Sequence, residues 1–144
     1  MPMVEIRDAG PADAPELAEL LGQLGYPTEA SAVVRRLDRL GASGVDRVLV
    51  AVDGGIVVGM VSVHVSRSLE YDGDAAKLSA VVVDERRRGT GVGRALIAAA
   101  GAEARARGCE VLWLTTAEHR AGAHAFYRAL GFEETGRRFA RLLN

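Results

Sequence analysis

The sequence predicts one α+β domain, with a mixed, mostly antiparallel central sheet and helices on both of its faces. Its 144 residues suffice for one hydrophobic core and leave no length for a second, so we expect a single domain over 1–144. The composition, 49% hydrophobic and 26% charged, is that of an ordinary globular protein. Segments with strand and helix periodicity follow one another in the order β-α-α-β-β-β-α-β-α-β, which indicates a sheet covered by helices.

Two helices are predicted in the N-terminal part, after a short extended run at residues 3–7. Turn and helix-start residues at 8–15 precede the first apolar stripe, and the break at 25–27 ends it. The first stripe consists of Leu17, Leu20, Leu21 and Leu24, and the second of Val33, Leu37 and Leu40.

Three strands are predicted in the middle of the chain. The runs at 47–52 and 56–65 are rich in β-branched residues, and the Asp53-Gly54-Gly55 sequence between them is a strong hairpin signal. The apolar run at 77–83 follows a polar loop and should pair with the strand before it.

The C-terminal part predicts two further helices and a closing sheet edge. An alanine-rich helical stripe begins at Val92 and can end at Gly108, and 110–115 follows as a strand. The last helical stripe contains Ala123, Phe126, Tyr127 and Leu130. We expect 132–143 to form one or two closing strands.

Composition excludes several classes of function. A formal net charge of −1 argues against a broad attraction to nucleic acid or anionic lipid, and the longest apolar stretch is too short to span a bilayer. Cys109 is the single cysteine, and no signal-like segment opens the chain, which suggests the cytoplasm. His119 and His124 are five residues apart with no further ligand around them, so we expect no metal. We therefore expect a cytoplasmic protein that binds neither nucleic acid nor membrane.

A glycine-rich loop carries the strongest functional signal. Gly89, Gly91 and Gly93 follow the strand that ends at Val83 and open the next helix. Backbone N–H groups at a helix start attract phosphate oxygens, and glycine lets a pyrophosphate approach closely. The neighbouring arginines at 86–88 can add charge-assisted hydrogen bonds. A phosphate-binding loop is thus favoured over a plain turn, although its spacing fits neither a P-loop nor a dinucleotide-binding loop.

Two motifs resemble one family. Arg88-Gly89-Thr90-Gly91-Val92-Gly93 resembles the Arg/Gln-x-x-Gly-x-Gly/Ala signature of the GNAT superfamily of acyl-CoA-dependent N-acetyltransferases. Downstream, Ala123-x-x-Phe126-Tyr127-x-x-x-Gly131-Phe132 resembles the next signature of that family. Both stand at the family's separation, inside a matching order of elements over nearly the whole chain. The resemblance implies the GNAT fold and the use of acetyl-CoA.

The resemblance also implies which residues bind acetyl-CoA. Residues 81–83 are similar to the family's splayed strand, whose backbone pairs with the amides of pantetheine. Arg120 stands where many relatives have an asparagine that contacts the cofactor, and a solvated helix-start arginine is an equal alternative. The residues expected at the cofactor are Val81, Val82, Val83, Arg88, Gly89, Thr90, Gly91, Val92, Gly93, Arg94 and Arg120.

Two catalytic residues follow from the same resemblance. A backbone N–H at Val82 or a neighbour would stabilise the charge that develops on the thioester oxygen. Tyr127 matches a tyrosine that protonates the departing sulfur, a role that suits a phenol because its pKa is near that of a thiol. Periodicity alone would instead place Tyr127 in the core.

The general base is less defined, because relatives often have a glutamate where this chain has residues 77–80. His64 is our candidate, since it lies near a strand end and an imidazole readily accepts a proton near neutral pH. Glu70 or Asp72 acting through water is an alternative, and a histidine with no catalytic role fits the position of His64 equally well.

The resemblance implies an N-acetyltransferase in which a primary amine attacks acetyl-CoA directly in a ternary complex. The segment 119–127 is similar to that of small bacterial enzymes that acetylate aminoglycosides, aminoalkylphosphonates or other small amines. Two alternatives are a non-catalytic acyl-CoA-binding module and acetylation of a protein or aminoacyl-tRNA amine. A homodimer through 132–143 is a further expectation.

Overall fold

A computed structural model describes residues 4–116 and 121–143. Five strands form one sheet in the order in which they occur along the chain, and four of them are antiparallel neighbours while the last pair is parallel. The mixed, mostly antiparallel sheet predicted from the sequence is thereby confirmed. The strands are β1 (Glu5–Asp8), β2 (Asp46–Asp53), β3 (Ile56–Ser66), β4 (Asp74–Val83) and β5 (Cys109–Leu114).

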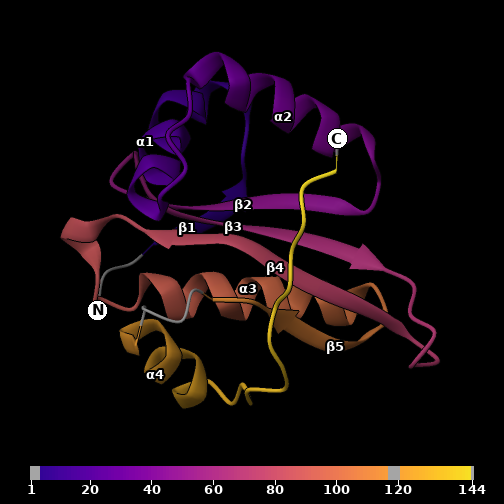
Figure 1. The fold of residues 1–144 in the computed structure, drawn as a ribbon. Helices are drawn as coiled ribbons and strands as arrows, with labels where there is room; N and C mark the ends of the chain where they lie inside the picture. The colour runs from indigo at the N-terminus through magenta and orange to yellow at the C-terminus, as the bar shows by residue number, and fades with distance from the viewer. Residues whose placement is uncertain (1–3, 117–120, 144) are drawn as a thin grey trace.

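Helices cover both faces of this sheet, as the sequence predicts. Figure 1 shows α1 (Ala14–Leu24) and α2 (Ala30–Ala42) on one face and α3 (Val92–Ala106) and α4 (Ala121–Ala129) on the other. Single turns of 3-10 helix, η1 (Pro11–Asp13) and η2 (Glu85–Arg87), precede the first helix and follow β4.

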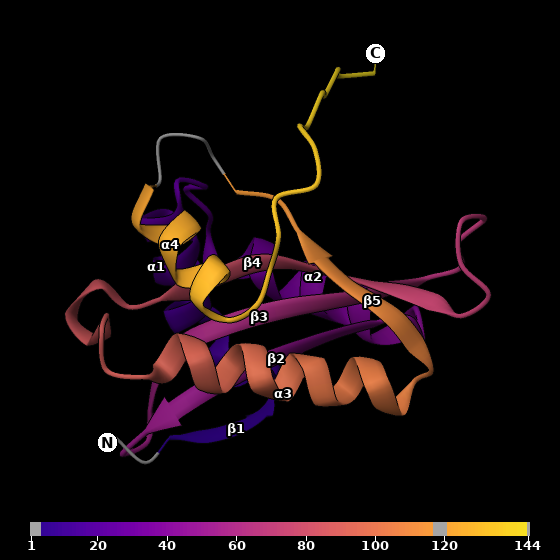
Figure 2. The same ribbon diagram turned by 90° about the horizontal axis from the view of Figure 1, so that it is seen from below.

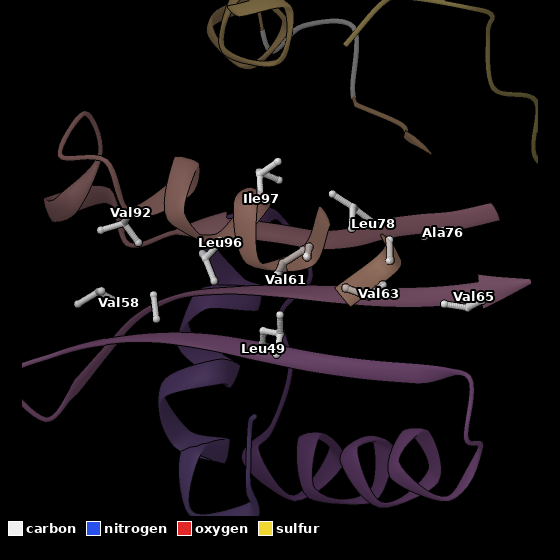
Figure 3. Packing of buried hydrophobic residues seen from close by; sticks show 13 residues of the cluster. Leu49, Val58, Val61, Val63, Val65, Ala76, Leu78, Val92, Leu96 and Ile97 are labelled. Atoms are coloured by element: carbon white, nitrogen blue, oxygen red, sulfur yellow. The ribbon is translucent and has the colours of Figure 1, made fainter. Parts of the chain in front are cut away.

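The central strand β3 is buried on both faces, so its sequence is nearly continuously apolar. Val61 and Val63 belong to the cluster under α3, together with Leu96 and Ile97 of that helix (Figure 3). Met60 belongs to the second cluster, which lies under α1. Because successive side chains of a strand point to opposite faces, β3 connects both layers of the core.

Gly59 allows α3 to lie close to the sheet where the glycine-rich loop begins. A Cβ atom at this position would stand 2.9 Å from Cδ1 of Leu96 and 3.1 Å from the carbonyl oxygen of Val82. Both distances are shorter than ordinary packing allows. The absence of a side chain here therefore sets the spacing between the end of β4 and the start of α3.

Replacing Gly59 with alanine is expected to lower the free energy of unfolding by about 1–3 kcal/mol, because the added methyl group overpacks this contact. Urea denaturation followed by circular dichroism measures it. Gly22→Ala is the matched control, since Gly22 lies in α1 with no atom within 4 Å of the added Cβ. The control should gain about 0.5–1 kcal/mol. Equal stability of the Gly59 variant and the wild type would contradict the contact.

The prediction of closing strands at 132–143 is wrong. These residues form no strand, and Phe132 is the one side chain among them that is partly buried. The physical reason is that the segment lacks an apolar face. Two consecutive glutamates at 133–134 and two consecutive arginines at 137–138 interrupt its apolar residues, and Gly136 lies between the two pairs. Its apolar side chains are nearly fully exposed: Phe139 (93%), Leu142 (91%) and Leu143 (85%).

Within the described ranges, no helix has both the length and the apolar character that crossing a bilayer requires.

Candidate active site

A β-bulge interrupts β4 next to its end. Ser79 pairs with Ser62, and Val82 pairs with Met60, so two residues of β4 lie opposite one residue of β3. Ala80 in this bulge has a φ of 49°, and it is the one non-glycine residue with positive φ among residues 4–116 and 121–143. Such a backbone conformation is unfavourable for alanine and is often found at functional sites. The bulge therefore marks this part of β4 as a candidate site.

β4 and β5 separate at the same place. Their parallel pairing runs from Asp74 and Cys109 to Leu78 and Leu114, and β5 ends there. The following residues of β4, 79–83, therefore have no partner from β5. Figure 2 shows β5 turning away from β4 towards α4. Pairing with β5 therefore stops before Val81, Val82 and Val83, where the splay is predicted, and leaves one backbone edge of these residues without a strand partner among the described residues.

The glycine-rich loop lies between β4 and α3. Gly89 (φ 77°) and Gly91 (φ 93°) have left-handed backbone conformations, and Gly91 is the N-cap of α3. The first N–H groups of α3, those of Val92, Gly93 and Arg94, have no acceptor inside the helix. A Cβ atom at Gly89 would meet no protein atom within 4 Å, so space is open on that side of the loop. These residues fit a pyrophosphate group.

The arginines around this loop fall into two groups. Arg86 pairs with Asp84 (3.4 Å) and stands 4.0 Å from Glu19, and Arg87 pairs with Asp53. Arg88 is exposed and its Nε donates to the carbonyl oxygen of Val83 (3.3 Å). Arg88 and Arg94 form no ion pair with any described residue. These two arginines are thus available for phosphate groups.

Asp84 holds the first turn of the loop in place. Its carboxylate is buried and accepts a hydrogen bond from the backbone N–H of Arg86 (2.9 Å). This N–H group, followed by the Arg86 guanidinium, holds the pKa of Asp84 below its usual value. The preceding N–H group, that of Glu85, donates to Oε1 of Gln23 in α1 (3.0 Å). The loop is therefore anchored both to itself and to α1.

Tyr127 of α4 lies in an aromatic cluster beside the loop. Its ring makes edge contacts with Phe126 (5.3 Å between centroids) and Phe132 (5.7 Å). A Cβ atom at Gly93 would stand 3.1 Å from Cζ of Phe126, so α4 packs directly on the first turn of α3. The same Cβ atom would stand 3.5 Å from Cγ2 of Val83, at the end of β4. The structure therefore brings Tyr127, the splayed strand and the glycine-rich loop together.

A cavity of about 590 Å³ opens beside Tyr127, at the outer side of β5. Trp113 and Leu114 of β5 line it, together with α4 and residues 132–139. Both ribbon views show the C-terminal segment leaving α4 and passing the end of β5 (Figures 1 and 2). The cavity has the size of a small-molecule site.

His64 lies away from the splay. It pairs across the sheet with Lys77, before the bulge in β4, and its Nδ1 is 2.7 Å from Oδ1 of Asp46. Although burial acts to raise the pKa of Asp46, hydrogen bonds from Ser43 and His64 hold it below its usual value. Lys77 also places its ammonium group 5.1 Å from the ring centre of Trp113. His64 is therefore part of a polar row across the sheet and stands apart from the aromatic cluster.

The remaining predicted residues are placed as follows. Glu70 and Asp72 are exposed in the loop before β4, farther from the splay than His64. Arg120 lies outside the described residues.

Burial, with a contribution from Asp74, raises the pKa of the Cys109 thiol, so this cysteine is not activated as a nucleophile. Among the described residues no group of three or more metal-ligating side chains occurs.

Two features of the site were missed by sequence reasoning. The left-handed conformation of Ala80 has no signal in the sequence, because alanine is not a residue that favours such a bulge. The cavity beside Trp113 depends on the C-terminal segment, which the sequence assigns to the sheet. The sequence of β5 gives no signal that Trp113 is exposed, because Glu110 is its one polar residue and no alternation of polar and apolar residues is present.

Comparisons with known proteins show which sequences and structures this chain resembles. Residues 15–132 match the sequence profile described as the Acetyltransferase (GNAT) family. An aminoglycoside N(6')-acetyltransferase type 1 of Stenotrophomonas maltophilia is 35% identical over 136 residues, 92% of this chain and 88% of that protein. An aminoalkylphosphonate N-acetyltransferase of Salmonella typhimurium is 36% identical over 93 residues, which span 65% of this chain and 60% of that protein. A crystal structure described as a transcriptional regulator from Bacillus halodurans superposes with a TM-score of 0.90 and 27% identity, covering 98% of this chain and 100% of that one.

Proposed function

Since this chain belongs to the GNAT family of acetyltransferases, we propose that it transfers the acetyl group of acetyl-CoA to a primary amine of a small molecule. The observation that supports this most is the common location of three elements. They are the loop at 88–94, the splayed end of β4 and the phenol of Tyr127. Together they match the needs of a phosphate-bearing thioester whose acyl carbon must be exposed to an amine.

Acetyl-CoA supplies an activated acyl group and a thiolate leaving group. Backbone N–H groups at 89–94 hold the pyrophosphate, and Arg88 and Arg94 bind phosphate oxygens. The free edge of Val81–Val83 binds the pantetheine amides, and an N–H at Val82 or a neighbour donates to the thioester oxygen. Tyr127 donates its proton to the departing sulfur.

The acceptor amine must lose a proton before or during its attack. We assign this step to His64 acting through water molecules: His64 lies away from the splay, but it belongs to the polar row that ends at Trp113, which lines the cavity beside Tyr127. Asp46 orients the ring through its contact with Nδ1. Glu70 and Asp72 remain the alternative bases.

Replacing His64 with glutamine is expected to lower kcat/KM at least tenfold at pH 7. It should also change how kcat/KM depends on pH on the acidic side of the optimum. Steady-state rates from pH 5.5 to 9 measure both. Arg67→Gln is the matched control, since Arg67 is exposed just after β3 and has no assigned role. An unchanged profile in the His64 variant would exclude His64 as the base.

Two other functions are tested by the same assay. A non-catalytic acyl-CoA-binding module would bind acetyl-CoA without amine-dependent thiol release. Acetylation of a protein or aminoacyl-tRNA amine would give turnover with such acceptors and none with small amines. The experiment is therefore thiol release from acetyl-CoA with a panel of small amines, after a calorimetric titration with acetyl-CoA alone. Binding plus amine-dependent release supports the proposal, and lack of binding overturns it.

A homodimer through the C-terminal segment is a further part of this proposal, supported by the exposed side chains of Phe139, Leu142 and Leu143.

A further inference from the structure

We propose that the acceptor of this enzyme is an amine that also carries an anionic group, which Arg137 and Arg138 bind beside Tyr127. The anion is a carboxylate, a phosphate or a phosphonate. This inference rests on the proposed acetyl transfer and adds the class of its acceptor.

The charge of the cavity at β5 is the first argument. Of the described residues that line it, three are arginines and one is a carboxylate. That carboxylate, Glu134, already pairs with Arg128 (3.4 Å). Arg137 and Arg138 form no ion pair with any residue in 4–116 or 121–143. Two guanidinium groups without an acidic partner that line one cavity favour the binding of an anion there.

The position of the two arginines is the second argument. They line the same cavity as Tyr127, the residue to which we assign proton donation to sulfur. An acceptor anchored there by its anion would extend its amine towards the splay of β4 and β5. Guanidinium groups bind carboxylate and phosphate oxygens in a bidentate manner, which fixes orientation as well as affinity. The arginines would therefore position the amine.

The other cavity walls suit a small polar molecule. Trp113 supplies a flat apolar wall, and Thr115 and Thr116 supply hydroxyl groups. Lys77 lies over the ring of Trp113 and adds a further positive charge on that side. A polycationic acceptor would meet like charges on several sides of this cavity, which disfavours its binding.

These arginines are separate from those that we assign to acetyl-CoA. None of residues 86–94 lines this cavity. Arg94 lines a different hollow, formed by α3, Leu112 of β5 and residues 130–132, together with Arg105. The anionic acceptor and the phosphates of acetyl-CoA are thus expected to use different cations.

The test compares matched amines that differ in one anionic group. The pairs are 2-aminoethylphosphonate with ethanolamine, glucosamine 6-phosphate with glucosamine, and β-alanine with propylamine, and spermidine represents polycations. We expect kcat/KM to be at least tenfold higher for the anionic member of one or more pairs. Which pair responds distinguishes a phosphonate, a phosphate or a carboxylate as the anion.

The double variant Arg137→Gln/Arg138→Gln is expected to reduce this preference at least tenfold, mainly through KM of the acceptor. Arg141→Gln is the matched control, since Arg141 is exposed in the same segment and does not line the cavity. Raising the salt concentration should raise the acceptor KM of the wild type.

Three results would overturn the inference. They are a preference for neutral amines or spermidine, an unchanged preference in the double variant, and a double variant whose main defect is a raised KM for acetyl-CoA. If acetyl-CoA binds and no amine of any charge is acetylated, the proposed transferase function fails as well. Turnover of amines without the anionic preference overturns only the acceptor class.

Discussion

Replacing Tyr127 with phenylalanine is expected to lower kcat about a hundredfold or more, while the Kd for acetyl-CoA changes by less than a factor of about three. Loss of a positioned proton donor typically slows a proton transfer by this factor. The ring contacts with Phe126 and Phe132 need no hydroxyl group, so the variant should fold. Steady-state kinetics and calorimetric titration with acetyl-CoA give the two quantities.

Tyr71→Phe is the matched control, because Tyr71 is an exposed phenol in the loop before β4 and has no assigned role. It should have the kcat of the wild type. A Tyr127 variant with wild-type kcat would show that the sulfur leaves without this acid, and Tyr127 would then be a packing residue of the aromatic cluster.

Replacing Gly89 with alanine is expected to raise the Kd for acetyl-CoA at least tenfold. Two effects act in the same direction. A left-handed φ of 77° is unfavourable for alanine by about 1–2 kcal/mol, and the new Cβ would occupy the open space that we assign to the pyrophosphate. Calorimetric titration measures the affinity, and urea denaturation measures the accompanying loss of stability.

Gly55→Ala provides the control for backbone strain. Gly55 lies in the β2–β3 hairpin with a φ of 82°, and the space around its Cβ position is open as well. Both variants should lose about 1–2 kcal/mol of unfolding free energy, and only the Gly89 variant should lose affinity. An equal loss of affinity in both would mean that general destabilisation, rather than the loop, controls binding.

Most of the fold can be predicted from local patterns in the chain. Helical stripes of leucine and valine and the Asp53-Gly54-Gly55 turn specify α1, α2 and the β2–β3 hairpin, because each pattern requires only neighbours in sequence. The glycine-rich loop is predictable for the same reason. Its glycines and arginines are adjacent, and their chemistry depends on the strand and helix that flank them.

The parts that could not be predicted depend on tertiary structure. The bulge at Ala80 lies where β4 remains paired with β3 on one side while its pairing with β5 ends on the other. This arrangement depends on three strands together, so no single residue encodes it. The segment after Phe132 has enough apolar residues to suggest a strand, yet the described sheet ends at β5 and leaves those side chains exposed. The sequence also gives no sign that His64 lies apart from the splay, because the two belong to successive strands, β3 and β4.

A labelled acetyl group tests whether the acetyl group passes directly from acetyl-CoA to the amine, as we propose. The enzyme is mixed with acetyl-CoA that carries a deuterated acetyl group, with and without 2-aminoethylphosphonate and the other amines of the panel. Mass spectrometry then follows the label on the amine and on the intact protein. We expect one labelled amine for each CoA thiol released and no label on the protein in the absence of amine. Label that accumulates on the protein without amine, or thiol release without labelled amine, would contradict it.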